Sequence, residues 1–314
     1  MKTMAGVSWR ISVLLILVVL FLMSASAFAK DVAVDCGKKN KSISAELAKL
    51  PAQGPHTIWV SGECHEAVVI ERRDDLTLVG MDGASIHDPT PENPGDNNVV
   101  LISESSRIQL ENLKIYGGSS GVVCVTFSSC HFIDLEVAGA AFDGISFSRS
   151  RGWVEGSIVV RDNEAGMTLW SQSTVLMNNG SDRVSIRNNA GWGLRLQDNS
   201  VLLLVGADVT DNGGDGISAD LGAEFRLLDV TVTDSGNNGV WMRSATGRFD
   251  AVTITGNTGD GVRVGQLSFA NFRGSANSAT GNSGTDIHCA SATAATVQAI
   301  QASAGGTTNC TDAP

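Results

Sequence analysis

The stretch GLRLQ at residues 193–197 begins with a glycine and then alternates apolar and polar side chains. The same pattern recurs as GISFS at 144–148 and as GVRV at 261–264. Alternation with a period of two is typical of a β-strand that buries one face, because successive side chains point to opposite sides. Each of these stretches is therefore predicted to be a short strand that opens with a glycine.

Eight such glycines recur at an almost constant spacing, with successive gaps of 23, 22, 27, 23, 23, 22 and 23 residues. Asn98 lies 23 residues before the first and is interpreted as a ninth member that lacks the glycine. A second series of apolar pairs runs in step with the glycines and lengthens at the same place. A period in the low twenties indicates one structural unit stacked on itself. The glycines are Gly121, Gly144, Gly166, Gly193, Gly216, Gly239, Gly261 and Gly284, and the pairs are Leu113/Ile115, Leu135/Val137, Ile158/Val160, Val184/Ile186, Ala207/Val209, Val230/Val232 and Val252/Ile254.

The length of the unit selects the fold class. About 23 residues hold two or three short strands but no crossover helix, since a βαβ unit needs about thirty residues. A leucine-rich repeat is excluded because its dense leucine code is absent. The sequence therefore predicts an all-β fold, a single-stranded right-handed parallel β-helix (a solenoid) of about nine to ten coils. Asn189, Asn212 and Asn257 each precede a unit glycine by four residues and are predicted to stack in one turn column.

The chain is predicted to consist of an export signal and one domain. Residues 1–29 combine basic Lys2 and Arg10 with an apolar core at 11–23 and an A-x-A site at 27–29, which is typical of a cleaved signal peptide. The alternative is an uncleaved anchor. Residues 30–314 are then one β-helix domain, with an N-terminal cap at about 30–60, coils at about 61–288 and a C-terminal cap at about 289–314. We expect a secreted or periplasmic protein.

A solenoid has to close its open ends, because unpaired strand edges would pair with other chains. Residues 42–50 (SISAELAKL) begin with a serine, have apolar spacing suited to a short amphipathic helix and are followed by Pro51. This segment is predicted to be the cap helix at the N-terminal end. The tail after Cys289 loses the repeat and is predicted to close the other end.

Charge and cysteines restrict the partners and the compartment. The net charge is −11, and it becomes −13 without residues 1–29, so nucleic acid and anionic membranes are disfavoured as partners. Six cysteines in an exported chain indicate disulfides, although six allow 15 connectivities. Their positions predict Cys36–Cys64, Cys124–Cys130 and Cys289–Cys310. A metal site is the alternative, but no C-x-x-C occurs and the histidines are scattered, so no metal is expected.

With its stacked glycine-led strands, its asparagine column and its cap helix, the chain resembles the pectate-lyase-like superfamily of right-handed β-helix proteins. The resemblance covers residues 31–289 and implies the fold, but not the activity, because the superfamily includes lyases, hydrolases, epimerases, esterases, phage tailspikes and adhesins. The motif set of polygalacturonases (N-T-D, D-D, H-G, R-I-K) and the W-x-D-H of pectate lyases are absent. The D-P-H-D motif of alginate epimerases is matched only by HDPT at 87–90, in the wrong order. No cofactor motif is present, and no cofactor is expected.

The polar positions of the glycine-led strands form an outer face with an unusual composition for so acidic a chain. Exposed tryptophans suit the apolar faces of sugar rings, and arginines bind carboxylates as a bidentate fork. We therefore expect an acidic polysaccharide to lie along this face, beside a wall made by the extra residues at about 171–182. The expected substrate-binding residues are Trp170, Arg195, Asp220, Trp241, Arg243 and Arg263.

Other interpretations of this face remain open. Arg243 and Asp220 are also placed for a cross-strand ion pair, and Arg263 and Trp241 for a cation–π contact without any ligand. If the protein is an enzyme, Arg195, Asp220 and Arg243 are the weak catalytic candidates for a lyase, hydrolase or epimerase. The rival hypothesis is a non-catalytic structural or surface-interaction solenoid. We expect a monomer.

Overall fold

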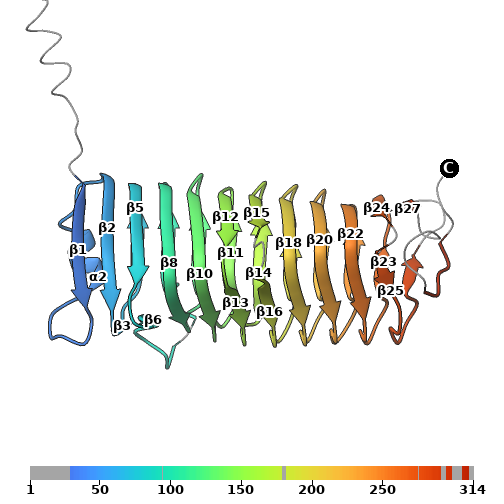
Figure 1. Ribbon diagram of the computed structural model, residues 1–314, viewed down its shortest axis with the longest axis horizontal. Helices are drawn as coiled ribbons and strands as arrows, with labels where there is room; N and C mark the ends of the chain where they lie inside the picture. Colours follow the sequence, from blue (N-terminus) through green and yellow to red (C-terminus); the bar gives the residue numbers. More distant parts are fainter. Residues whose placement is uncertain are drawn as a thin grey trace, which may run out of the picture.

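The chain forms a long parallel β-solenoid whose rungs follow one another from the N-terminal to the C-terminal end (Figure 1). The computed structural model describes residues 29–93, 95–178, 182–274, 276–290, 295–298 and 306–310. Its strands form two hydrogen-bonded sheets of 17 and ten strands, here called the long-strand sheet and the glycine sheet. Every strand pair in the two sheets is parallel, as the periodicity predicts.

The long-strand sheet covers two sides of the solenoid, because many of its strands bend in the middle. Strand β18, for example, pairs with β15 through its first half and with β16 through its second half, on either side of Gly206. The strands are β1 (Lys30–Asp35), β2 (Gln53–Ser61), β3 (Glu63–His65), β5 (Asp74–Gly80), β6 (Ser85–His87), β8 (Ser106–Tyr116), β10 (Ser129–Ala138), β12 (Arg151–Glu155), β13 (Ile158–Arg161), β15 (Thr174–Asn178), β16 (Val184–Arg187), β18 (Val201–Thr210), β20 (Glu224–Thr233), β22 (Thr246–Thr255), β24 (Ser268–Arg273), β25 (Ser278–Ala279) and β27 (Ala295–Gln298).

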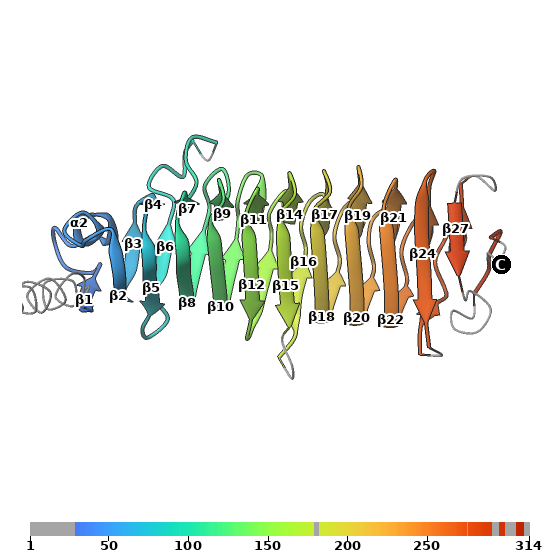
Figure 2. The ribbon, with the colours of Figure 1, turned by 90° about the horizontal axis from the view of Figure 1, so that it is seen from above.

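The glycine sheet covers the third side and contains the glycine-led strands of the repeat. Its strands follow one another along the upper edge of the solenoid in the view from above (Figure 2). They are β4 (Val68–Glu71), β7 (Val100–Ser103), β9 (Val122–Val125), β11 (Asp143–Ser148), β14 (Ala165–Trp170), β17 (Leu194–Leu196), β19 (Ile217–Asp220), β21 (Val240–Arg243), β23 (Val262–Val264) and β26 (Ile287–Cys289).

The register confirms both series of the repeat. In the glycine sheet Leu194 pairs with Ile217, and in the long-strand sheet Val209 pairs with Val232, which pairs with Ile254. The inward side chains fill a continuous core, which includes the ring contacts Phe225–Phe249 and Phe249–Phe272 with centroids 5.6 and 4.5 Å apart. Twelve successive rungs join β1 to β27, so the solenoid has about 11 turns rather than nine to ten. The first turns precede the glycine series, which is why the repeat count missed them.

The N-terminal cap contains the expected helix in a shorter form, α2 (Ile43–Leu47). Ser42 caps the helix with its hydroxyl, and Glu66 accepts hydrogen bonds from the backbone N–H groups of Ile43 and Ser44 at 2.7 and 2.9 Å. Ile43 and Leu47 are buried, so the helix covers the end of the core. The predicted cap segment at 30–60 also holds rungs β1 and most of β2, which already pair in parallel.

An asparagine ladder runs beneath the turn that leads into the glycine sheet. The Nδ2 of Asn163 donates to Oδ1 of Asn189 at 3.0 Å, and the Nδ2 of Asn189 donates to Oδ1 of Asn212 at 2.9 Å. Asn257 continues the ladder to Asn282 at 2.8 Å. The predicted stacking of Asn189 on Asn212 is thus confirmed. Ser235 stands between Asn212 and Asn257 and interrupts the column, with its buried hydroxyl left without a hydrogen-bond partner.

The repeated glycine is explained by close approach to this ladder. A Cβ on Gly193 would lie 2.6 Å from the carbonyl oxygen of Gly216 and 2.8 Å from Nδ2 of Asn212. These separations are shorter than any real Cβ contact, so a side chain here would push the next rung or the ladder away. Glycine and asparagine therefore recur together, because the backbone at each repeat glycine lies directly against the ladder asparagine of the next rung.

Three sequence predictions about register are wrong. Asn98 is not the ninth member of the glycine series, since Val100 pairs with Val122 and Val99 therefore occupies the position equivalent to Gly121. Gly284 is not the eighth member of the glycine series, since Val262 pairs with Ile287 and Asp286 occupies the position equivalent to Gly261. The extra residues of the long unit do not rise beside Trp170. They fall between Met177 and Val184, at the corner between β15 and β16 of the long-strand sheet.

The three predicted disulfides are present. Cys36–Cys64 joins the N-terminal cap to β3, Cys124–Cys130 spans a turn between the two sheets, and Cys289–Cys310 ties the tail to β26. Residues 1–28 of the expected signal peptide at 1–29 and most of the expected C-terminal cap at 289–314 lie outside the described residues. The described part of the chain has no helix long and apolar enough to span a membrane.

Completing the asparagine ladder should stabilise the protein. In Ser235→Asn, a new Oδ1 would accept hydrogen bonds from the backbone N–H and Nδ2 of Asn212, as Asn212 itself does for Asn189. We expect a gain of about 1–2 kcal/mol in the free energy of unfolding, measured by urea denaturation. Ser235→Ala, which removes the unpaired hydroxyl without extending the ladder, is the control. A destabilised Ser235→Asn protein would contradict this account of the turn column.

Candidate functional site on the glycine sheet

The polar residues of the glycine-led strands face away from the core, as predicted. Leu194 and Leu196 are fully buried on the inner side of β17, whereas Arg195 between them lies on the outer side. Val240 and Met242 likewise bury the inner side of β21 and leave Trp241 on the outer side. The expected site residues therefore share one face, on which their side-chain contacts form three clusters.

The first cluster is a cation between two indoles. The guanidinium carbon of Arg195 lies 4.3 Å from the ring centroid of Trp192 and 5.5 Å from that of Trp170. Cation–π contacts of this kind orient an arginine without neutralising its charge. Within the part of the chain that the structure describes, Arg195 forms no salt bridge, so its hydrogen-bonding edge is available to an anionic ligand.

A pocket of about 370 Å³ opens beside this cluster. It is lined by Trp170, Trp192 and Arg195 together with Asp143 and Glu164. Burial raises the pKa of the Asp143 carboxyl, while hydrogen bonds from Thr168 and Ser146 and the charge of Arg195 act in the opposite direction. The pocket thus combines a cation, two aromatic faces and a carboxyl whose proton affinity is increased.

The second cluster is the ion pair that the sequence left open. Asp220 is buried and accepts hydrogen bonds from Nε2 of Gln197 at 3.0 and 3.1 Å, and Nη2 of Arg243 lies 3.3 Å from its Oδ2. The guanidinium of Arg243 also lies over Trp241 on its own strand, 5.4 Å from the ring centroid. Asp220 and Arg243 therefore satisfy each other, and the geometry favours the structural interpretation of this pair.

In the third cluster Arg263 lies in register beside Trp241, as the sequence predicts, but its guanidinium pairs with a carboxylate. Nη1 of Arg263 lies 3.8 Å from Oδ2 of Asp260, and Nδ1 of His288 lies 2.7 Å from the same oxygen. The expected cation–π contact with Trp241 is formed by Arg243 instead, because residues two apart on one strand share a face.

Sequence analysis missed Asp143, and a detectable signal marks it. Asp143, Asp215 and Asp260 each stand immediately before a glycine of the repeat. Burial also raises the pKa of Asp215, which accepts hydrogen bonds from Asn237 and Asn238. Asp143 differs from Asp215 in that it lines a pocket.

The described residues bring three potential metal ligands together at one place, Cys36, Cys64 and Glu66. Both cysteines are joined in a disulfide, and Glu66 caps helix α2, so these groups are already engaged. This cluster is therefore structural.

The family of the chain follows from a comparison with family models. The model described as a right-handed β-helix region matches residues 98–247 and 176–308, which together cover more than half of the chain. The chain therefore belongs to the right-handed β-helix family, and the handedness expected from the sequence is confirmed. No curated protein is significantly similar to the chain.

Solved structures share the fold at low sequence identity. Pectate lyase Pel9A matches with a TM-score of 0.52 and 11% identity over 93% of this chain and 79% of its own. The enzymatically active domain of tailspike protein 2 from bacteriophage CBA120 matches with a TM-score of 0.52 and 13% identity, over 87% of this chain and 43% of its own. The A-module of mannuronan C-5 epimerase AlgE6 from Azotobacter vinelandii matches with a TM-score of 0.48 and 14% identity, over 82% and 91%.

The raised pKa of Asp143 predicts a pH-dependent cost in stability. A carboxyl that holds its proton more tightly in the folded state stabilises the fold below its unfolded pKa, and this stabilisation is lost as the pH rises through the folded pKa. Asp143→Asn should therefore raise the thermal midpoint at pH 7 by about 2 °C, and the difference should disappear near about pH 3. Glu92→Gln, at an exposed position, serves as the control. A lower midpoint for Asp143→Asn at pH 7 would contradict the assignment.

Proposed function

We propose that the protein binds an acidic polysaccharide on the glycine sheet, with one sugar residue in the pocket beside Trp170, Trp192 and Arg195. The observation that carries the proposal is the guanidinium of Arg195, held between two indole rings without a salt bridge among the described residues. Aromatic rings present an apolar face to a sugar ring, and a guanidinium binds a carboxylate through two parallel hydrogen bonds. A uronate residue offers both features to the pocket.

The shared fold supports this proposal at the level of the class. Pectate lyase Pel9A is named for a reaction on a polysaccharide, and it has the same solenoid fold. The three disulfides support an exported location, secreted or periplasmic, because disulfides persist in oxidising compartments. An exported protein would meet polysaccharides outside the cytoplasm.

Asp143 favours processing as well as binding. A carboxyl with a raised pKa beside a cation suits general acid or base chemistry at a bound uronate. Of the residues expected from sequence, Arg195 lies beside this carboxyl, whereas Asp220 and Arg243 bind each other. We therefore propose Asp143 and Arg195 as the pair that would act in a lyase, hydrolase or epimerase reaction.

The rival hypothesis, a non-catalytic structural solenoid, has its own support. Arg243 and Arg263 both lie beside carboxylates of the protein, as they would on a face that contacts no ligand. The polysaccharide hypothesis requires Arg195 for binding, whereas the structural hypothesis does not.

Binding of acidic polymers to the full chain tests the proposal. Wild-type protein should bind polygalacturonate or polymannuronate in calorimetric titrations. Arg195→Ala and Trp192→Ala should each weaken binding about tenfold, since each removes one of the two groups that would contact the sugar. Arg273→Gln, an exposed arginine on the long-strand sheet, is the matched control and should bind as wild type does.

The same polymers test processing. Appearance of unsaturated product, of new reducing ends or of an epimerised sugar, together with its loss in Asp143→Asn, would support an enzyme. Binding without any of these products would restrict the protein to a binding role. Equal affinity of Arg195→Ala and wild type would contradict the proposed site.

A further inference from the structure

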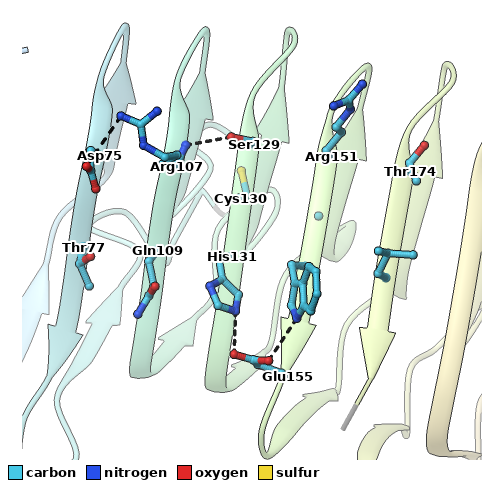
Figure 3. A pocket seen from close by; sticks show the side chains of 13 residues that line it. Asp75, Thr77, Arg107, Gln109, Ser129, Cys130, His131, Arg151, Glu155 and Thr174 are labelled. Carbon is cyan, nitrogen blue, oxygen red and sulfur yellow. Dashed lines mark hydrogen bonds and ion pairs between the residues drawn. The ribbon is translucent and has the colours of Figure 1, made fainter. Parts of the chain in front are cut away.

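A second hollow lies on a different side of the solenoid, on the outer surface of the long-strand sheet (Figure 3). It has a volume of about 690 Å³ and crosses strands β5, β8, β10, β12 and β15. Five side chains form its central row in parallel register, so neighbouring members lie about 4.8 Å apart. The row consists of Thr77, Gln109, His131, Trp153 and Leu176. None of these residues belongs to the site on the glycine sheet.

Trp153 is a fixed aromatic surface in this row. Its Nε1–H donates to Oε2 of Glu155 at 3.1 Å, and Nε2 of His131 lies 2.9 Å from Oε1 of the same carboxylate (Figure 3). The rings of His131 and Trp153 meet edge to face with centroids 6.3 Å apart. The indole is thereby held by its polar edge while 48% of the residue surface remains exposed. A tryptophan that is both oriented and exposed suits stacking against a planar or ring-shaped ligand.

Uncompensated positive charge adjoins the tryptophan. Arg151 lies two residues before Trp153 on β12, and it lines both this hollow and an adjoining one of about 560 Å³. Arg149 and the 81% exposed Phe127 line the adjoining hollow. Across the described ranges, neither Arg149 nor Arg151 forms an ion pair.

The charge is confined to one end of the hollow. Arg107, at the other end, has its guanidinium 2.7 Å from Oδ2 of Asp74 and is neutralised by it. Because the chain as a whole carries a net charge of −11, two unpaired arginines beside exposed aromatic rings mark a local preference for an anion. The anionic group of a ligand is therefore expected at Arg151, with its ring system over Trp153.

We propose that the hollow around Arg151 and Trp153 is a second saccharide-binding site, which takes an oligosaccharide carrying carboxylates. A sugar ring would stack on Trp153, its carboxylate would lie against Arg151 and Arg149, and its hydroxyls would reach Gln109, Thr77 and Thr174 along the groove. The site is independent of the pocket at Arg195, and together the two would let one molecule bind two stretches of polymer.

Calorimetric titration of the full chain in an Arg195→Ala background isolates this site. Hexamers of galacturonate and of mannuronate are the probes, and at least one should bind saturably. Trp153→Ala and Arg151→Gln should each weaken that binding about tenfold, and Arg151→Lys should lose less because it keeps the charge. Trp59→Ala and Arg273→Gln, an exposed tryptophan and an exposed arginine on the same sheet, should leave it unchanged.

A hexamer whose carboxylates have been reduced to alcohols should bind more weakly, and Arg151→Gln should not affect it further. The proposal is overturned if neither acidic hexamer binds in the Arg195→Ala background, or if the control variants lose as much affinity as Trp153→Ala. It is also overturned if Trp153→Ala reduces the sedimenting mass, since the hollow would then be a subunit interface. Should Trp153→Ala fail to fold, by its thermal midpoint, the comparison of Arg151→Gln with Arg273→Gln decides.

Discussion

The parallel stacking of one backbone rung on the next is the constraint on which the rest of this structure depends. Each rung lies about 4.8 Å from its neighbours, so residues about 23 apart in the chain become adjacent. At the entry to the glycine sheet the stacking leaves no room for a Cβ, and the amide side chains of Asn189 and Asn212 bond along the axis at 2.9 Å. Glycine and asparagine thus recur because the backbone itself passes close to the next rung.

This constraint also decides what kind of site the protein can have. Strands of three to six residues in the glycine sheet present few outward side chains each, so any binding surface has to be assembled across rungs. Trp192 and Arg195 come from one rung and Trp170 from the rung before it, and His131, Trp153 and Leu176 come from three successive rungs of the long-strand sheet. A straight solenoid therefore offers long rows rather than deep cavities, and a linear polymer matches that geometry.

The fold was predictable from sequence because period and alternation are directly visible in it. The three disulfides were predictable too, since cysteines close in the chain also lie close in a solenoid. The register of the strands at the ends of the solenoid was not predictable. Gly284 keeps the spacing of the repeat, but Asp286 takes the glycine position, because two extra residues in the last turn shift the strand. Likewise, the extra residues of the long unit could not be assigned to a corner, because both strand series lengthen together.

The candidate sites were only partly predictable. The sequence placed Arg195, Trp170 and Trp241 on one face correctly, since alternation decides which side a residue faces. The sequence could not decide which side chains contact one another, because a long side chain can reach several neighbours. Arg243 lies over Trp241, and Arg263 pairs with Asp260. Asp143 is the first residue of β11 and precedes the repeat glycine, outside the alternating positions that the sequence analysis considered. Trp153 stood in β12, whose glycine, Gly152, is not part of the repeated glycine series, so the pattern that located the first face could not draw attention to the second.

The spacing of rungs can be measured directly. Spin labels on cysteines introduced at Gln109 and Arg226, which occupy the same row five rungs apart, report the distance by pulsed dipolar spectroscopy. Parallel stacking predicts a separation of about 24 Å, and moving the second label to Arg248, one rung further, should add about 5 Å. Distances that do not increase by one rung spacing would contradict the stacked register, and both proposed surfaces would fall with it.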